Sequence, residues 1–284
     1  MRSPTLSRIP KSEKSLFSYL FALLFAVAFV DGWRRAEVNP LVFFDAENRG
    51  NLWKFISGMF PPDLSSDFLS LMIRPALETI QISVMGTIIA IAIGFPLGIL
   101  GTRTFSIGGI LNEADIQGSP LRRTWRFSAY FAARGLLSLF RSIPEFVWAF
   151  MFVRAVGLGP FSGVLAIAVA YGGMLGKVYS EIFEAANERP LEALQSTGAS
   201  KLQVFIYGWF PQVLPNFVSY TLYRWECAVR ASAVLGLVGA GGLGQQIEIS
   251  MRMFNFHEVL TLLGILFVMV AAVDYISAKV RAML

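Results

Sequence analysis

Six long apolar runs, separated by shorter polar stretches, dominate the chain. An α-helix needs about 20 mostly apolar residues to cross a bilayer, so we interpret each run as one membrane-spanning helix. The runs are at residues 16–30, 77–101, 127–156, 161–179, 213–237 and 259–276. The pattern predicts an all-α, polytopic membrane protein with about six transmembrane helices.

Three regions follow from this pattern. Residues 1–15 form a basic tail, residues 16–76 contain the first span and an outer segment, and residues 77–284 form the core transmembrane domain. The first run is followed by Asp31-Gly-Trp-Arg-Arg and by no small-residue cleavage site, so we expect an uncleaved helix. Within the outer segment, a short interfacial helix is expected to stop at Pro61-Pro62.

Composition supports a membrane protein and limits its chemistry. Hydrophobic residues make up 55% of the chain, charged residues only 15%, and the mean hydropathy is +0.58. A single cysteine, Cys227, excludes an intrachain disulfide framework. The formal charge of +5 does not come from a basic run interleaved with aromatic residues, so no nucleic-acid partner is expected.

The distribution of lysines and arginines predicts how the chain is oriented in the membrane. Of the 24, thirteen fall in segments that the six-span topology places with both termini, six fall in the opposite segments, and five lie inside the spans. Basic residues are enriched in cytoplasmic loops of membrane proteins. We therefore expect cytoplasmic N- and C-termini, together with a cytoplasmic loop at residues 187–211.

That loop reads as two short helices with a break between them. Pro190 suits the first turn of a helix, and Gly198 can end it in a left-handed conformation. Ser200 and Gln203 have the spacing of a capping box for a second helix, which is expected to end by Pro211.

The same loop resembles the EAA loop of type I ABC importer permeases, through Glu192-Ala193-Leu194, Gly198 and Phe210-Pro211. The chain departs from the family pattern at Leu194, Gly208 and Phe210. A competing match, Glu184-Ala185-Ala186, lacks the glycine six residues later. The resemblance implies a type I permease fold whose cytoplasmic coupling helix docks on an ATPase subunit through Pro190, Leu191, Glu192, Ala193, Leu194, Gly198 and Ala199.

Charged residues inside the predicted spans are the second candidate site. A charge at this depth is costly unless it is paired or lines a cavity. The arginines outnumber the acids, and guanidinium groups match phosphoryl oxygens well, so an anion pathway is one interpretation. Structural pairing is the other, with Glu226 and Arg230 at ion-pair spacing and Glu145 near Arg141. The pathway candidates are Arg134, Arg141, Glu145, Arg224, Glu226 and Arg230.

A glycine-rich segment lies between the last two spans. Gly239, Gly241 and Gly244 have the dinucleotide-fold spacing, but they follow a membrane helix rather than a β-strand, so we expect close backbone packing instead. The segment comprises Gly236, Gly239, Gly241, Gly242 and Gly244. No phosphate-binding loop or metal cluster is evident, His257 is expected to cap the last helix, and Asp274 could pair with Lys279 or face the interior.

A longer resemblance narrows the family. Phe60-Pro-Pro-Asp63, Arg141-Ser-Ile-Pro-Glu145, Ser219-Tyr-Thr-Leu-Tyr-Arg224 and Val234 to Gly244 are similar to permease subunits of phosphonate ABC importers and their phosphite and hypophosphite relatives. The resemblance implies an inner-membrane homodimer, two cytoplasmic ATPase subunits that bind ATP and Mg²⁺, and an outside substrate-binding protein. It also implies alternating access of the pathway, with no cofactor or ATPase site in this chain.

Two alternatives stay open. A permease of the same class could carry phosphate, methionine or another anion. A membrane enzyme acting on lipid phosphates is the other alternative, but it would need a nucleophile, a base or a metal cluster that the sequence does not reveal.

Overall fold

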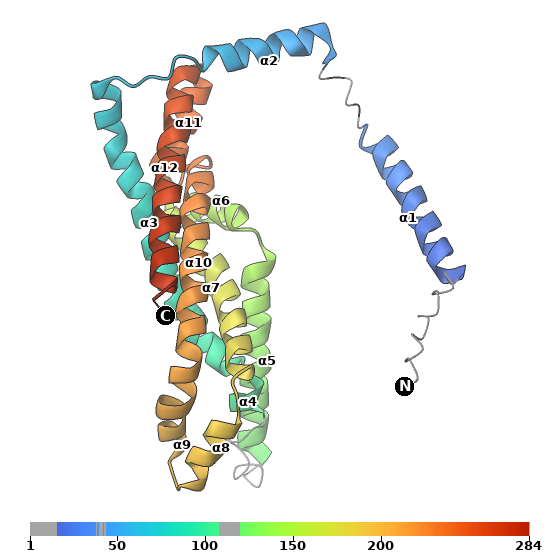
Figure 1. Ribbon diagram of the computed structural model, residues 1–284, viewed down its shortest axis with the longest axis vertical. Coiled ribbons are helices and arrows are strands. Elements are labelled where there is room, and N and C mark those ends of the chain that lie inside the picture. Colours follow the sequence, from blue (N-terminus) through green and yellow to red (C-terminus); the bar gives the residue numbers. More distant parts are fainter. Residues whose placement is uncertain (1–15, 38, 40–41, 43, 108–119, 284) are drawn as a thin grey trace, which may run out of the picture. The chain divides into compact units, whose positions relative to one another are not determined.

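The computed structural model describes residues 16–37, 39, 42, 44–107 and 120–283, and the regular elements of this part are all helices (Figure 1). It divides into a unit of residues 1–57 and a unit of residues 58–284. The first unit contains α1 (Leu16–Arg35) and most of α2 (Ala46–Gly58). Helix α1 is long and apolar enough to cross a membrane, as predicted, and α2 ends before Pro61 and Pro62.

The second unit contains the remaining helices. In chain order these are α3 (Ser66–Leu100), α4 (Arg103–Ser106), α5 (Pro120–Ser142), α6 (Glu145–Val156), α7 (Pro160–Glu184), α8 (Arg189–Ser196), α9 (Lys201–Gln203), η3 (Val204–Trp209), α10 (Phe210–Gly236), α11 (Gly242–Arg252) and α12 (Phe256–Arg281).

Helix α3 starts well before the predicted position of Leu77. The Ser65 side chain accepts a hydrogen bond from the Phe68 N–H, which caps the helix at its true start. Further along, Gly94 lies so close to α7 that a Cβ there would be 2.8 Å from the Gly172 carbonyl oxygen. The lack of a side chain at Gly94 therefore allows α3 and α7 to approach closely.

The third predicted span is not one helix. It is divided into α5 and α6, which meet at an angle of 90°. Pro144 has no backbone N–H and disfavours a helical conformation at Ile143, so the first helix ends and a second starts at Glu145. The prediction of one continuous helix over residues 127–156 is therefore wrong.

Four helices of the described residues are long and apolar enough to span a membrane, or five if α5 and α6 form one broken span. The prediction was about six. Helix α10 coincides with the fifth predicted span but is not among the four, and it carries Arg224, Glu226 and Arg230.

The core of the second unit is built around α7. Its buried side includes Ala166, Ala170, Tyr171, Leu175 and Tyr179, and it packs against α3, α5, α6 and α10. Toward the end of α7 the core becomes aromatic, with rings of Phe105, Phe183, Phe205, Trp209 and Phe217 in contact. This aromatic cluster supports the end of the unit that holds α8 and α9 (Figure 1).

Candidate coupling loop and translocation pathway

We call residues 187–211 the coupling loop. The prediction that it contains two short helices with a break between them is confirmed. Pro190 and Glu192 lie in the first turn of α8, and Gly198 adopts φ +85°, the left-handed conformation that follows a helix end. The Ser200 hydroxyl accepts from the Gln203 N–H at 3.4 Å, while the Gln203 side chain accepts from the Ser200 N–H at 2.8 Å. The capping box is complete.

The predicted end of the second helix at Pro211 is wrong. Helix α9 passes into a π-helical turn, η3, and then into α10, in which Pro211 occupies the first turn. A proline is tolerated there because the first backbone N–H groups of a helix need no partner within it. The loop is therefore continuous with the long helix α10.

Helix α8 is held in place by groups on both sides of the loop. The Leu191 side chain is fully buried and lies against Gly208, where a Cβ would be 2.7 Å from the leucine Cδ2. Its neighbours Pro190, Glu192 and Ala193 are exposed. Gly208, where the chain departs from the EAA pattern, thus provides room for Leu191, and α8 presents an exposed face.

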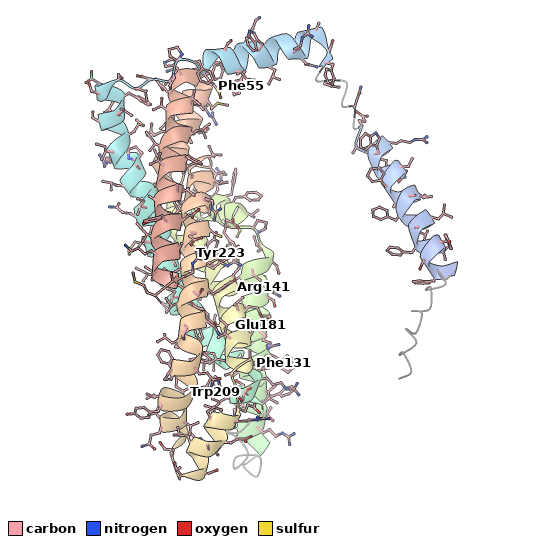
Figure 2. All side chains as sticks on the ribbon, viewed as in Figure 1. Phe55, Phe131, Arg141, Glu181, Trp209 and Tyr223 are labelled. Atoms are coloured by element: carbon pink, nitrogen blue, oxygen red, sulfur yellow. The ribbon has the colours of Figure 1, made fainter. Side chains whose placement is uncertain are left out.

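Two side chains that the sequence analysis did not single out support the loop. The Trp209 Nε1–H donates to the Phe183 carbonyl at 3.1 Å, and Trp209 is 1% exposed. The Gln212 side chain accepts from the Asn187 N–H and donates to the Asn187 carbonyl at 3.3 Å. These contacts join the end of α7 to η3 and α10. Figure 2 shows Trp209 toward the end of the bundle where α8 and α9 lie.

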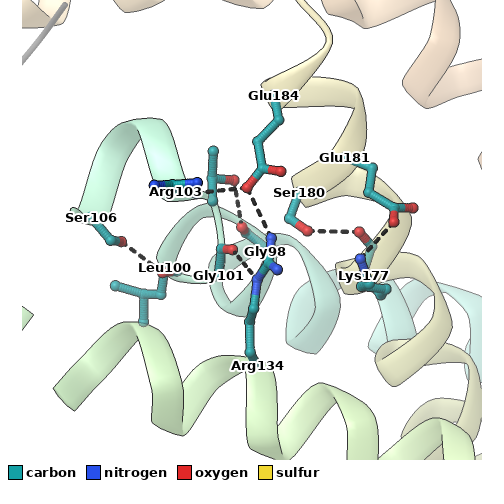
Figure 3. A network of polar contacts seen from close by, with 11 residues as sticks. Gly98, Leu100, Gly101, Arg103, Ser106, Arg134, Lys177, Ser180, Glu181 and Glu184 are labelled. Carbon is teal, nitrogen blue, oxygen red and sulfur yellow. Dashed lines mark hydrogen bonds and ion pairs between the residues drawn. The ribbon is translucent and has the colours of Figure 1, made fainter. Parts of the chain in front are cut away.

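Arg134 is paired. Its Nη2 lies 2.9 Å from Oε1 of Glu184, and its Nε donates to the Gly101 carbonyl at 3.0 Å (Figure 3). Glu184 also accepts from the Arg103 N–H at 2.8 Å. The structural alternative that we kept open is therefore realised at Arg134, and the competing Glu184-Ala185-Ala186 match contains the partner.

Glu226 does not pair with Arg230. Its Oε1 lies 2.6 Å from Nη2 of Arg281, at the end of α12, while the Arg230 Nη2 lies 3.9 Å from the Cys227 sulfur. The four-residue spacing on α10 predicted Arg230 as the partner of Glu226. That prediction is wrong because Arg281 of α12 pairs with the carboxylate instead. Arg230 is left exposed, and it has no carboxylate partner among the described residues.

Arg224 is surrounded by tyrosines. Its Nε donates to the Tyr220 hydroxyl at 2.8 Å, and its guanidinium carbon lies 5.3 Å from that ring and 5.8 Å from the rings of Tyr171 and Tyr223. No carboxylate of the described residues pairs with it. Tyr220 and Tyr223 could have been found from their spacing to Arg224, whereas Tyr171 comes from α7 and needs the fold.

Arg141 and Glu145 lie on opposite sides of the break between α5 and α6. Arg141 is exposed in the last turn of α5, and Glu145 is half-buried in the first turn of α6. Neither forms an ion pair within the described part of the chain, so the Arg141–Glu145 contact we considered is not seen.

The glycine-rich segment packs as expected. Gly239, Gly241 and Gly242 have positive φ, and a Cβ at Gly244 would lie only 1.8 Å from the Ala233 carbonyl oxygen. Two polar residues of α3 complete the turn, since the Thr79 hydroxyl accepts from the Leu243 N–H at 2.9 Å and Glu78 accepts from the Gly242 N–H at 3.2 Å. Neither residue was predicted to have this role from the sequence. Backbone geometry thus fixes the start of α11.

Two minor predictions are also resolved. The cap of α12 is Asn255 and not His257, whose carbonyl instead accepts from the Asp63 N–H at 3.4 Å. Asp274 does not pair with Lys279 in the described residues, and its Oδ1 is buried without a hydrogen-bond partner. No group of three or more potential metal ligands occurs in the part of the chain that the structure describes.

Comparison with known proteins places this geometry in a family. Residues 116–281 match the model of the binding-protein-dependent transport system inner membrane component. The chain is 40% identical over 81% of its length to a protein of Stutzerimonas stutzeri named as a phosphite transport system permease, HtxC, of which the match covers 74%. It is 37% identical to the phosphite transport system permease protein PtxC of the same species, over 78% of this chain and 73% of that protein.

A more distant relative and a solved structure agree with this. The phosphate-import permease protein PhnE of Mycolicibacterium smegmatis is 32% identical over 87% of this chain and 43% of its own length. The fold is similar to a chain of the methionine ABC transporter MetNI in an inward-facing conformation, with a TM-score of 0.64 and 23% identity over 78% of this chain and 99% of that one. The chain belongs to the family of permease subunits of binding-protein-dependent ABC importers, which work in the inner membrane with an ATPase subunit and a substrate-binding protein.

Proposed function

We propose that this chain is the transmembrane subunit through which an ATP-driven importer takes up phosphite, a phosphonate or a related phosphorus oxyanion. The observation that carries the proposal is Arg224, a half-buried cation that is held by tyrosines and is not paired with any carboxylate of the described residues. The names of the phosphite transport permeases to which the chain is similar support the same class of cargo.

The positive charge of Arg224 is suited to bind an anion that moves along the pathway. Tyr220 accepts from Nε alone, so the terminal nitrogens of the guanidinium keep their N–H donors for a ligand. Guanidinium groups bind phosphoryl oxygens in a two-point geometry. Arg141 and Arg230, both exposed, extend the pathway, and Glu145 balances part of its charge. Arg134 and Glu226 are engaged in ion pairs and support the helices around it.

The assembly is a homodimer, because a transport pathway on a two-fold axis needs the same lining helices from a second copy. Each copy binds one ATPase subunit, which holds ATP and Mg²⁺, at the exposed face of α8 and the following turn. The exposed residues Pro190, Glu192, Ala193 and Gly198 form that face, while Leu191, together with the half-buried Leu194 and Ala199, anchors it from beneath. Both termini lie in the cytoplasm, in keeping with the distribution of basic residues.

Alternating access then follows from the geometry of the loop. When the ATPase subunits close on ATP, the two α8 helices are drawn together, and the helices joined to them rotate to open the pathway to the loaded binding protein. Hydrolysis returns the bundle to its starting arrangement. The side chains of this chain guide the anion and exclude lipid, and they take part in no covalent step.

Reconstitution tests the cargo. The permease, its ATPase and its binding protein are placed in proteoliposomes, and ATP-dependent uptake of labelled phosphite, methylphosphonate, phosphate and D-methionine is compared. We expect uptake of phosphite or the phosphonate to exceed that of D-methionine. Preferential uptake of D-methionine would overturn the proposal; the chain is 28% identical over 72% of its length to a D-methionine transport permease of Vibrio cholerae.

Replacing Arg224 tests the pathway within the same complex. Since a hydrogen bond to a charged group contributes about 1.5 to 3 kcal/mol, Arg224→Met is expected to lower oxyanion uptake about tenfold or more. Arg224→Lys keeps the charge and should lose less. Arg154→Met, in the exposed last turn of α6, is the matched control and should transport normally. Equal uptake by Arg224→Met and Arg154→Met would remove Arg224 from the pathway.

A further inference from the structure

One carboxylate joins three structural elements at the end of α7. Oε1 of Glu184 lies 2.9 Å from Nη2 of Arg134 on α5 and accepts from the Arg103 N–H, at the start of α4, at 2.8 Å. Arg134 also donates through Nε to the Gly101 carbonyl, 3.0 Å away, at the end of α3. We call this set the Glu184 junction: Glu184, Arg134, Arg103 and Gly101. Figure 3 shows Arg134 reaching from α5 toward both Glu184 and Gly101.

The junction is next to the coupling loop along the chain. Glu184 is the last residue of α7, and only residues 185–188 separate it from α8. The neighbouring groups are also engaged, because the Phe183 carbonyl accepts from Trp209 and the Asn187 backbone pairs with Gln212. The end of α7 is thus connected on one side to η3 and α10, and on the other side to α3 and α5.

A second ion pair on α7 provides a contrast. Lys177 and Glu181 lie 2.5 Å apart, four residues from each other on the same helix. That ion pair therefore connects no other helix to α7, although it also joins a basic side chain to a glutamate. Glu184 and Arg134 are each about one-third exposed, at 30% and 33%, whereas Glu181 is 54% exposed. The Glu184 junction differs from the Lys177–Glu181 pair because it connects several helices, not because its charged groups are of another kind.

We propose that Glu184 is a positioning residue for transport, which makes α3, α5 and α7 move together when the ATPase subunit moves α8. The proposal rests on the proposed function, since it requires ATP-driven transport, but it assigns Glu184 no contact with the cargo or with nucleotide. Without the junction, α8 would still bind the ATPase through its exposed face. The packing of α7 against α5 would remain, but this end of α7 would no longer be fixed to α3 and α5 by polar contacts, and ATP would be hydrolysed with less transport.

The test measures coupling in the reconstituted complex. Basal ATPase activity, its stimulation by the loaded binding protein, and the amount of oxyanion imported per ATP hydrolysed are compared for the natural protein, Glu184→Ala, Glu184→Gln and Glu181→Gln. Coupling between sites typically corresponds to a factor of about 5 to 150. We expect Glu184→Ala to lower import per ATP about fivefold or more, Glu184→Gln to lower it less, and Glu181→Gln to leave it unchanged.

A structural role alone is excluded by two further readouts. The melting temperature of each complex shows whether the variant is folded, and the exchanged pair Glu184→Arg with Arg134→Glu should regain part of the import per ATP. If the natural complex transports but Glu184→Ala imports as much per ATP as Glu181→Gln, the inference is wrong while the proposed function stands. If the natural complex shows no stimulated hydrolysis with any oxyanion, the proposed function itself fails.

Discussion

The two ends of the second unit are held together by different means. At the coupling end, polar side chains bridge between elements, as Glu184, Trp209 and Gln212 do. The glycine-rich turn is also held by the side chains of Thr79 and Glu78, but here backbones touch directly as well, and Gly236 and Gly244 leave no room for a Cβ. Side-chain bridges can break and re-form at modest cost, whereas a close backbone contact leaves less room for rearrangement. We therefore expect motion to be concentrated at the coupling end and the turn to stay rigid.

Gly244→Ala should produce the largest effect. The added Cβ would lie 1.8 Å from the Ala233 carbonyl oxygen, so the start of α11 must move away from α10, at a cost on the order of 4 kcal/mol. Thermal unfolding of the detergent-solubilised protein measures it. Gly264→Ala in α12, where no atom lies within 4 Å of the new Cβ, is the control. Equal melting temperatures for the two variants would contradict a rigid turn.

Leu191→Ala should have a smaller and more local effect. Leu191 is fully buried under α8, and its truncation is expected to cost about 2 kcal/mol because the short helix can settle into part of the space. We expect faster proteolysis within residues 187–200 and weaker binding of the ATPase subunit, with little change in the melting of the rest. Leu202→Ala serves as the comparison, since Leu202 is 67% exposed. A change in both variants alike would indicate that burial of Leu191 is not what positions α8.

The smallest effect concerns Asp63, in the segment before α3. Hydrogen bonds from the Ser65 N–H and hydroxyl, with a weaker contribution from the charge of His257, lower the pKa of Asp63 below its ordinary value of 3.8. A lowered pKa means that these contacts stabilise the fold while Asp63 is ionised, above about pH 4, and that the contribution is lost as the pH falls through the native pKa.

Titration of Asp63 tests this directly. Melting temperatures of the natural protein and Asp63→Asn should differ above about pH 5 and converge in acid, since both then lack the charge. Asp63 is partly exposed and its charge is held by local hydrogen bonds from Ser65, so we expect only a small difference, below the effect of Leu191→Ala. A difference that grows in acid would contradict the sign of the pKa change.

Local signals in the sequence were the most informative. The capping box at Ser200 and Gln203 and the left-handed Gly198 depend on neighbouring residues alone, and both were predicted. Contacts between residues that are far apart in the sequence were not predicted. Glu226 pairs with Arg281, although Arg230 is nearer to it in the sequence. The Tyr171 ring, which contacts Arg224, belongs to another helix. The break at Pro144 had a local signal, but the apolar run on both sides of it outweighed that signal in our interpretation.

The π-helical turn at Val204–Trp209 has a consequence for the spacing of the coupling loop. Because such a turn accommodates one more residue than an α-helical turn, it sets the angular phase between α9 and α10. If the same residues instead formed ordinary α-helix, the extra residue would rotate everything before it by about 100° relative to α10. Leu191 would then lose its contact with Gly208. The π-helical turn therefore keeps α8 in register with α10.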